Sequence, residues 1–416
     1  MISVYTPTHR ASTLVRAYRS LKSQSHEDWE WVLLVNGTLS ASEVPAEIVA
    51  DARVRVIRSG TSANVGALKA EACSHAAGDL LVELDHDDEL RADCLSTLKA
   101  YEERTPGGFY FSDFCELQSD GVSKEYGAEW GWDKYPTVWD NGSNIVAMRS
   151  KEVTARSLYQ IYYAPNHVRA WSRQAYEAAG GYRPLDICDD HDLLIRTYLA
   201  GVPMVRIAAC LYLQHCHSEQ TQVIHNKQIQ KKQADIGAKN LPALCWEWAR
   251  RNKLSCWDLG GAHNPEPGYS TLDQHPGADI QWDVRKGLPF EDNSVGVLRA
   301  FDFLEHVPIG SVVPFMNECW RVLAPGGWML TATPSTDGRG AFQDPTHVSF
   351  WNANSFWYYT QAQHRNYVPE ITAKFQLARQ HDYFPSNWHK EQHISYVAAD
   401  LWALKGQERC GVDLIG

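Results

Sequence analysis

LLVELDHDDEL, residues 80–90, joins a run that predicts a buried β-strand to four consecutive polar residues at 85–88. Open α/β sheets bind their ligands outside the carboxyl ends of the strands. Asp85 and Asp87 are two residues apart, so in an extended chain both carboxylates point the same way. Such a pair can share Mn²⁺ or Mg²⁺, which bridges well to phosphate oxygens. The pattern predicts a site for a nucleoside diphosphate with its metal, although a solvated acidic turn has the same composition.

Strands and helices alternate around this segment. Predicted strands at 2–4, 31–35 and 54–57 each run into a polar or glycine-bearing turn, and a helical pattern follows the third strand through Ala76. Such alternation is typical of βαβ units and of a parallel sheet. We therefore expect an α/β fold in which four strand ends gather polar turns along one edge.

The order of these segments resembles the family 2 inverting glycosyltransferases of GT-A fold. The matching segments are TPTHR, VLLVNG, ANVGALKAEACSHAAGDLLVELDHDDEL, PNHVRAW and CDDHDLLIRTYLAG. Several motifs in the expected order are more specific than any one of them alone. The resemblance implies a Rossmann-like GT-A domain over residues 1–225 that binds a nucleotide sugar, with a UDP-sugar as first choice, and a divalent cation.

The resemblance also implies which residues bind the donor and the metal. Asp85 and Asp87 match the metal-binding Asp-x-Asp pair, with His217 as a third ligand and His215 as the alternative. Two histidines two apart on a strand face one way and could hold a metal, although a histidine in the core is more usual. The residues placed near the nucleotide sugar are Thr6, Thr8, Arg10, Asn36, Asn64, Gly66, Lys69 and Asp85.

Residues 188–195 place three acids at the start of a predicted amphipathic helix. Acids favour a helix N-terminus because of its unpaired N–H groups and dipole, which accounts for at least one of them. An inverting transfer needs one carboxylate to take the proton of the attacking hydroxyl. The resemblance places this base in an acidic pair before such a helix, with Asp190 as first choice, Asp189 second and Asp192 third.

Residues 126–148 are rich in Trp, Tyr and Gly. This composition predicts a loop with aromatic contacts, either for recognition of an acceptor or for packing, because loops on a rigid scaffold often carry recognition. Residues 226–254 then predict a polar, solvated helix that links two domains.

A second strand–turn–strand pattern starts after this linker. Predicted strands at 256–259 and 270–273 flank the turn Gly260–Pro265, and the second strand ends in an acid. Such a turn lets a ligand approach the backbone closely, and the acid can bind ribose hydroxyls. The pattern favours a second nucleotide-binding domain.

This half resembles the class I S-adenosylmethionine-dependent methyltransferases. The matching segments are DLGGAHNPEPGYSTLD, DVRKGLPFEDNSVGVL, FLEHV, ECWRVLAPGGWML and DPTHVSFWNANSFWYYT. The resemblance implies a Rossmann-like fold over residues 255–416, with S-adenosylmethionine as cofactor. Ala262 stands where a third glycine is usual, so the turn must shift or crowd the cofactor; a scaffold without cofactor is the alternative. The cofactor-binding residues implied are Asp258, Gly260, Gly261, Asp273 and Asp283.

Composition agrees with a globular protein of two domains. The chain has 416 residues, 44% hydrophobic and 21% charged, with a net charge of −11. That charge argues against nucleic acid as a partner, since binding it normally needs a positive face. We expect no transmembrane segment and no signal peptide. Ten scattered cysteines without a CxxC motif predict a reduced, cytoplasmic protein.

These observations lead to one functional hypothesis and two alternatives. We expect a metal-dependent inverting glycosyltransferase that moves a sugar to a hydroxyl acceptor, a glycan by preference, with a methyltransferase-like domain after it. The first alternative acceptor is a hydroxylated base, such as hydroxymethylcytosine, in viral DNA. The second alternative is a non-catalytic sugar-binding scaffold, against which the acids at 85–87 and 189–190 argue.

Overall fold

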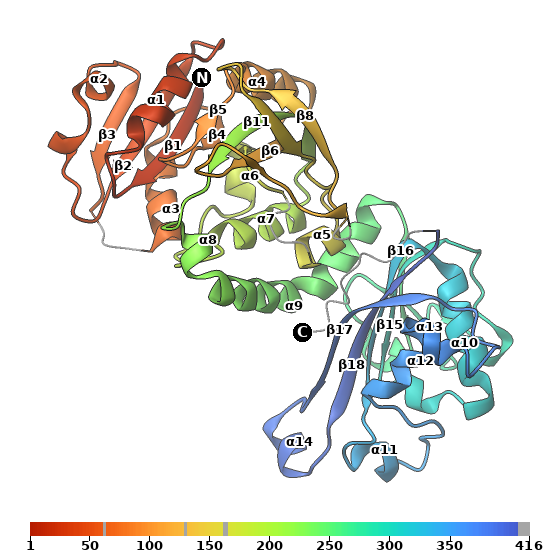
Figure 1. The fold of residues 1–416 in the computed structure, drawn as a ribbon. Coiled ribbons are helices and arrows are strands. Elements are labelled where there is room, and N and C mark those ends of the chain that lie inside the picture. Colours follow the sequence, from red (N-terminus) through yellow and green to blue (C-terminus); the bar gives the residue numbers. More distant parts are fainter. Residues whose placement is uncertain (61–63, 129–130, 161–164, 407–416) are drawn as a thin grey trace. The chain divides into compact units, whose positions relative to one another are not determined.

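The computed structural model describes residues 1–416 apart from 61–63, 129–130, 161–164 and 407–416. The chain divides into two compact units, Met1–Asn240 (the first unit) and Leu241–Gly416 (the second unit). The division falls inside helix α9 (Asn226–Arg251), so the predicted linker is one long helix shared by both units. Each unit is built around its own sheet (Figure 1). None of the helices in the described part of the chain is both long and apolar enough to cross a membrane.

The sheet of the first unit is parallel at one side and mixed at the other. Its described strands run in the order β3-β2-β1-β4-β10-β6-β11-β5. The first four are mutually parallel, which confirms the βαβ prediction, whereas β10 is antiparallel to both of its neighbours. The strands are β1 (Ile2–Thr8), β2 (Trp29–Val35), β3 (Val54–Arg58), β4 (Leu80–Glu83), β5 (Glu89–Leu90), β6 (Phe109–Leu117), β7 (Ser123–Lys124), β8 (Lys134–Val138), β9 (Asn144–Met148), β10 (Arg169–Ser172) and β11 (Met204–His215).

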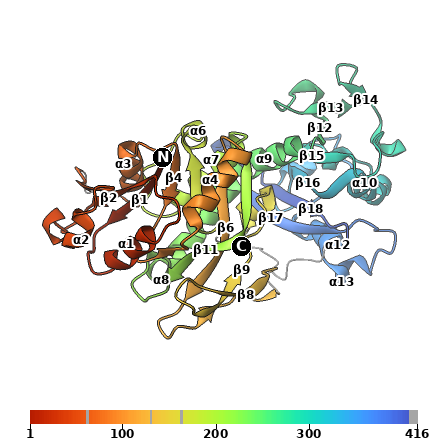
Figure 2. The same ribbon diagram turned by 90° about the horizontal axis from the view of Figure 1, so that it is seen from above.

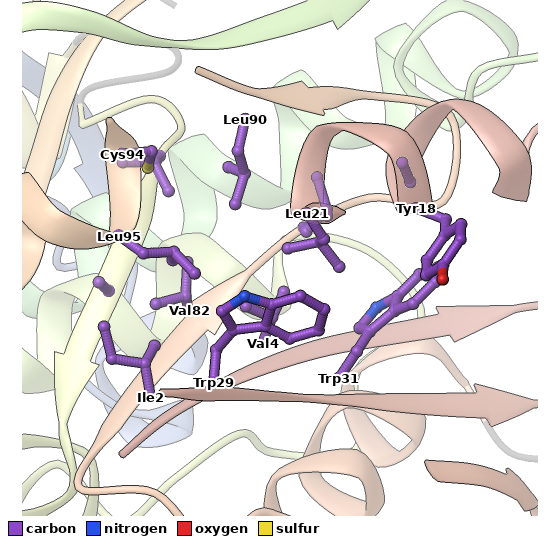
Figure 3. Packing of buried hydrophobic residues seen from close by; sticks show 14 of the residues in the cluster. Ile2, Val4, Tyr18, Leu21, Trp29, Trp31, Val82, Leu90, Cys94 and Leu95 are labelled. Carbon is purple, nitrogen blue, oxygen red and sulfur yellow. The ribbon is translucent and has the colours of Figure 1, made fainter. Parts of the chain in front are cut away.

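Helix α1 (Leu14–Lys22) of the first unit buries one apolar stripe in the core beside this sheet. Its buried residues include Leu14, Ala17, Tyr18 and Leu21, the 3.6-residue period of an amphipathic helix. Figure 3 shows Tyr18 and Leu21 beside Trp29 and Trp31 of β2 in this core. Burial of each large apolar side chain contributes about 1.5–3 kcal/mol. The other helices are η1 (Ala41–Glu43), α2 (Ala46–Val49), α3 (Val65–His75), α4 (Cys94–Arg104), α5 (Ala155–Gln160), α6 (Arg173–Ala178), α7 (Asp189–Leu199) and α8 (Thr221–Ile224).

The aromatic-rich segment 126–148 is a loop at its start and a β-hairpin over 134–148. In the loop, Trp132 contacts the rings of Tyr126 and Phe114. Strands β8 and β9 pair in antiparallel register from Lys134↔Met148 to Val138↔Asn144. Trp139, at the start of the connecting turn, is buried, and its N–H donates to the Ser143 carbonyl oxygen at 2.9 Å. The loop prediction is therefore wrong only for 134–148, where two short strands occur. Residues 129–130 of the segment lie outside the described residues.

The second unit confirms the predicted α/β arrangement. Its described strands run in the order β14-β13-β12-β15-β16-β18-β17, with β18 antiparallel to both neighbours. Strands β16, β18 and β17 lie side by side in Figures 1 and 2. The strands are β12 (Ser255–Leu259), β13 (Ser270–Asp273), β14 (Ile280–Gln281), β15 (Val295–Phe301), β16 (Leu323–Pro334), β17 (Phe375–Tyr383) and β18 (Tyr396–Ala403). The helices are η3 (Gly261–His263), η4 (Val284–Lys286), η5 (Leu304–His306), α10 (Ile309–Val322), α11 (Gly340–Gln343), η6 (Ala353–Phe356), α12 (Trp357–Thr360), α13 (Ala362–Arg365) and α14 (Asn387–Glu391).

Candidate functional site

The acids after β4 lie in a turn. The strand ends at Glu83, and the Asp88 N–H donates to the Asp85 carbonyl oxygen at 3.3 Å. The expectation of an extended chain through Asp85 and Asp87 is therefore wrong. Asp87 Oδ2 lies 2.6 Å from His217 Nε2, whereas Asp85 Oδ2 lies 3.8 Å from His167 Nε2. The two predicted ligands thus face different histidines at the same end of the sheet.

Carboxylates at this sheet end have donor chemistry that suits a hard divalent cation, and the ligand atoms that lie within 4.8 Å of one another here belong to Glu83, Asp85 and His167. Two of the three predicted ligands, Asp87 and His217, are already in contact, and the Asp85 side chain is 41% exposed. Burial, and then the charges of Asp87 and Asp85, raise the pKa of Asp88 well above its usual value. A bound cation would relieve this crowding of negative charge. The alternative ligand His215 instead lies 2.7 Å from Glu89 Oε1.

Glu83, the last residue of β4, sits at the centre of a buried charge network. Lys69 Nζ lies 2.6 Å from Glu83 Oε1 and 3.0 Å from Asp189 Oδ2. Arg169 Nη1 lies 3.4 Å from Glu83 Oε2 and 2.8 Å from Asp190 Oδ2. Burial disfavours the charged form of Glu83, but Lys69 and Arg169 outweigh it and hold its pKa well below the usual value. His167 Nε2 joins the network to the acid turn, 3.8 Å from both Glu83 and Asp85.

Asp190 is the partly exposed member of the acidic pair at the start of α7. Its side chain is 30% exposed, against 6% for Asp189. Burial opposes ionisation of Asp190, but Arg169 and then Lys69 lower its pKa below the usual value, so it is a carboxylate at neutral pH. Burial dominates at Asp189 and raises its pKa to about 6, despite Lys69. A reachable carboxylate is what a general base requires.

Asp192, the third choice for the base, is committed elsewhere. Its carboxylate lies 2.7 Å from Arg196 Nη2, one turn along α7, and 3.5 Å from Arg183 Nη1. This pair stabilises the helix in the usual i, i+4 manner. Asp190 is more exposed than Asp192, with 30% against 13% of the side chain, although Arg169 and the His191 N–H both contact the Asp190 carboxylate. Its role as the base stays a prediction.

The predicted donor-binding residues of β1 and β2 make contacts within the protein. Thr6 Oγ1 donates to the Leu84 carbonyl oxygen at 2.6 Å and accepts from Trp31 Nε1 at 2.8 Å. Thr8 Oγ1 is bonded to the backbone of Arg10, whose guanidinium lies 2.7 Å from Glu219. Asn36 lies half-buried after the end of β2. Thr6 and Thr8 thus fix the strand ends around the acid turn, and the nucleotide contacts stay a prediction.

The Asn-x-Gly motif before α3 shows why those residue types occur there. Asn64 Oδ1 accepts from the Ala67 N–H at 3.0 Å and caps the helix. A Cβ on Gly66 would lie 2.0 Å from the Arg183 carbonyl oxygen, so only glycine fits against that backbone. Close packing here brings Lys69 of the same helix onto the Asp189 carboxylate. The motif therefore positions the charge network, and direct donor contacts by Asn64 and Gly66 stay a prediction.

Four site residues were missed from the sequence: Glu83, His167, Arg169 and Tyr212. The Tyr212 hydroxyl donates to Asp88 Oδ2 at 2.9 Å and accepts from the Asp85 N–H at 3.1 Å, which fixes the acid turn. A charged residue inside a buried strand, as at Glu83, is a signal that could have been used. Arg169 lies in the motif PNHVRAW, where it was given no role.

The glycine turn of the second unit is a single 3-10 turn. Gly260 has a φ of +78°, and a Cβ there would lie 2.7 Å from the Phe303 ring. The turn continues as η3, where Ala262 stands in a right-handed helical turn and its methyl group needs no unusual backbone. Whether the methyl group of Ala262 crowds a cofactor stays a prediction. Residues 260–269 join β12 to β13 with η3 and a loop, where parallel strands are usually joined by an α-helix.

Of the predicted cofactor-binding acids, Asp273 is the most available. The half-buried Asp273 accepts from the Ala262 N–H at 3.4 Å, beside Gly260 and Gly261. Both Asp258 oxygens lie 2.9 Å from Arg299 Nη1, and Asp283 Oδ2 lies 2.6 Å from Arg285 Nη2. The turn and Asp273 fit the ribose of a nucleoside, whereas Asp258 and Asp283 are already paired within the protein.

Comparison with known families matches each unit to a different family. The family model described as "Glycosyl transferase family 2" matches residues 3–143, and the model described as "Methyltransferase domain" matches residues 269–331. Among curated relatives, a "Putative colanic acid biosynthesis glycosyl transferase WcaA" of Escherichia coli is 26% identical over 119 residues, 27% of this chain and 43% of that protein. A "Probable S-adenosylmethionine-dependent methyltransferase" of Mycolicibacterium smegmatis is 36% identical over 84 residues, 19% of this chain and 32% of that protein.

The chain thus spans less than half the length of these curated relatives. Among solved structures, Staphylococcus aureus TarS 1–349 in complex with UDP-GlcNAc superposes with a TM-score of 0.42 and 14% identity, covering 64% of this chain and 76% of that one. The same protein without that ligand gives a TM-score of 0.41, also at 14% identity, covering 64% of this chain and 75% of that one.

Proposed function

We propose that this chain, which carries a family 2 glycosyltransferase domain followed by a methyltransferase-family domain, transfers a sugar from a nucleotide sugar to a hydroxyl acceptor with inversion. The segment that matches the glycosyltransferase model lies in the first unit, and the segment that matches the methyltransferase model lies in the second. The acceptor class that we propose is a glycan hydroxyl. This proposal concerns the first unit; the role of the second is proposed separately below.

One observation carries the proposal: an unbroken series of contacts links the acid turn to the partly exposed Asp190. It runs from Asp85 through His167 to Glu83, and from Glu83 through Arg169 to Asp190. A site for a nucleoside diphosphate with its cation and a site for a proton acceptor would thus share one sheet end. Displacement at an anomeric carbon needs both at once.

The residues of the first unit supply the groups that this reaction needs. A divalent cation held by Asp85, Asp87 and His217 would offset charge on the departing diphosphate. The acceptor oxygen bonds to the anomeric carbon as the bond from that carbon to the diphosphate oxygen breaks. The Asp190 carboxylate takes the proton of the attacking hydroxyl. Arg169 holds this carboxylate at 2.8 Å and keeps it ionised.

For the second unit we propose binding of S-adenosylmethionine at the turn that contains Gly260 and Gly261. Asp273, half-buried beside that turn, would accept from the ribose hydroxyls. When bound, this cofactor supplies an electrophilic methyl group. Because the two domains occur in one chain, we propose that a hydroxyl of the same glycan accepts the methyl group.

A turnover assay with the full chain tests the proposal. We would incubate the protein with a panel of nucleotide sugars and Mn²⁺, offer glycan acceptors or hydroxymethylcytosine-containing DNA, and measure release of nucleoside diphosphate. We expect release that depends on a glycan acceptor and stops when EDTA removes the cation, with an inverted anomer by NMR. Release of nucleoside diphosphate only with the DNA would show that the acceptor is a hydroxylated base rather than a glycan. No release with any donor would favour a sugar-binding scaffold.

A further inference from the structure

We propose that Glu305, His306 and His347 of the second unit form a binding site for a divalent transition-metal ion. One ligand atom of each side chain lies within 4.8 Å of the others. The residues come from two segments: Glu305 and His306 from η5, which follows β15, and His347 from the loop after α11. None of them belongs to the acid turn or to the glycine turn described above, although Phe303, the residue before η5, packs against Gly260 of the glycine turn.

Hydrogen bonds orient both imidazoles as metal ligands. His306 Nδ1 lies 3.2 Å from the Thr346 carbonyl oxygen, and His347 Nδ1 lies 3.1 Å from the Ala341 carbonyl oxygen. A carbonyl oxygen only accepts, so each Nδ1 carries the proton and each Nε2 keeps a lone pair. Metal-binding histidines are usually held in this way by a second hydrogen bond, which fixes the tautomer and the ring.

The Glu305 carboxylate is buried without a basic partner. The residue is 2% exposed, and its Oε2 accepts from Thr333 Oγ1 at 2.7 Å. No Lys or Arg within the described ranges forms an ion pair with it. Burial raises its pKa above the usual value. A buried carboxylate is costly unless a positive charge lies beside it, and a bound cation between Glu305 and the two histidines would supply that charge.

Backbone contacts hold the two segments in register. The Glu305 carbonyl oxygen accepts from the N–H groups of Val348 at 2.8 Å and Ser349 at 3.0 Å. Ser349 Oγ donates to the Leu304 carbonyl oxygen at 2.7 Å. Glu305 and His347 are therefore positioned by the fold before any ligand binds, as a metal site requires.

The ligand set distinguishes this site from the acid turn of the first unit. Two imidazoles and one carboxylate suit Zn²⁺ or Fe²⁺, whereas carboxylates and water suit Mg²⁺ or Mn²⁺. Three protein ligands leave a fourth position for water or for a substrate hydroxyl in the open type of zinc site. His306 is exposed, so solvent reaches the cluster. The probe of choice is Zn²⁺ alone.

Calorimetric titration of the full chain with Zn²⁺ tests the site. The titration would use metal-free protein carrying Asp85→Asn and Asp87→Asn, so that the acid turn contributes little. We expect one Zn²⁺ site that is lost in the added His306→Ala/His347→Ala variant. Thr333→Val, which removes only the hydroxyl that orients Glu305, should weaken Zn²⁺ binding by about 10–100-fold. Thermal melting of each variant without metal establishes that it is folded.

A matched control comes from a second histidine pair in the same unit. The rings of His263 and His275 lie with centroids 4.3 Å apart, and within the described residues this pair forms no three-residue ligand group. His263→Ala/His275→Ala should leave the Zn²⁺ affinity unchanged. Absence of a Zn²⁺ site, its persistence without His306 and His347, or full affinity in a folded Thr333→Val protein would overturn the proposal.

Discussion

Both units have acidic residues at corresponding ends of their sheets, but these residues differ in exposure and in their partners. After β4 and before α7, Asp85 and Asp190 keep 41% and 30% of their side chains exposed, although His167 lies 3.8 Å from Asp85 and Arg169 lies 2.8 Å from Asp190. After β12, Asp258 is buried with both oxygens on Arg299. An acidic residue at a strand end therefore does not by itself form a binding site. What decides its availability is whether an arginine from another strand occupies both of its oxygens.

Neutralising Asp190 is the substitution from which we expect the largest effect. Because a positioned base typically contributes ~10²–10⁴ in rate, Asp190→Asn should lower sugar transfer by that factor. Donor affinity should change little, since Asn keeps the size of the side chain. Single-turnover transfer and calorimetric titration of the nucleoside diphosphate measure the two effects separately.

Asp192→Asn is the matched control, because Asp192 lies two residues after Asp190 in the same helix turn but is paired with Arg196. It should retain near-parent transfer. Loss of transfer in the control with near-normal turnover in Asp190→Asn would move the role of base away from Asp190. Loss in Asp189→Asn alone would assign it to the buried neighbour.

The charge network behind the exposed acids should be a stability element. Lys69→Met leaves the buried carboxylates of Glu83 and Asp189 without their shared cation. Removing one partner of a buried pair typically costs about 3–5 kcal/mol. Lys99→Met, which removes a lysine with a 39% exposed side chain from its pair with Glu102, should cost under about 1 kcal/mol. Urea unfolding of the two variants measures the difference, and equal midpoints would contradict the account.

The smallest expected effect concerns the glycine turn of the second unit. Asp273→Asn should weaken binding of S-adenosylhomocysteine by about tenfold or more, since hydrogen bonds to a charged group contribute about 1.5–3 kcal/mol. Asp283→Asn should weaken it less, because Arg285 already occupies that carboxylate. Thermal shift at graded ligand concentration compares them, because a ligand of the folded state raises the melting temperature. A larger loss of affinity in Asp283→Asn than in Asp273→Asn would show that Arg285 releases the Asp283 carboxylate when the ligand binds.

Much of the fold follows from local sequence pattern. The strands around 2–4, 31–35, 54–57 and 80–84 and the strands at 256–259 and 270–273 all occur in the structure. Their apolar runs are long enough to mark buried strands, and their order requires βαβ crossovers. The hairpin at 134–148 was not predictable in this way because its strands are short and alternate only weakly between apolar and polar residues.

The sequence indicated where the acids of the candidate site lie, but not which side chains they pair with. Pattern located the acids at 85–87 and 189–190, yet the extended-chain argument failed where β4 gives way to a turn. Arg169 of β10 is 21 residues before Asp190 of α7, and Arg299 of β15 is 41 residues after Asp258 of β12. Such pairs depend on how strands are ordered in the sheet, which periodicity does not encode. The same limit hid the grouping of His347 with Glu305.

The most direct test of the central claim is calorimetric titration of UDP into the full chain with and without Mn²⁺, in the parent protein and in Asp87→Ala. Asp87 is the acid in contact with His217. If the acid turn binds a nucleoside diphosphate through a cation, Mn²⁺ should strengthen UDP binding in the parent protein. Asp87→Ala should lose most of that gain, because the cation loses a ligand. Equal UDP affinity in the two proteins with Mn²⁺ present would contradict the account.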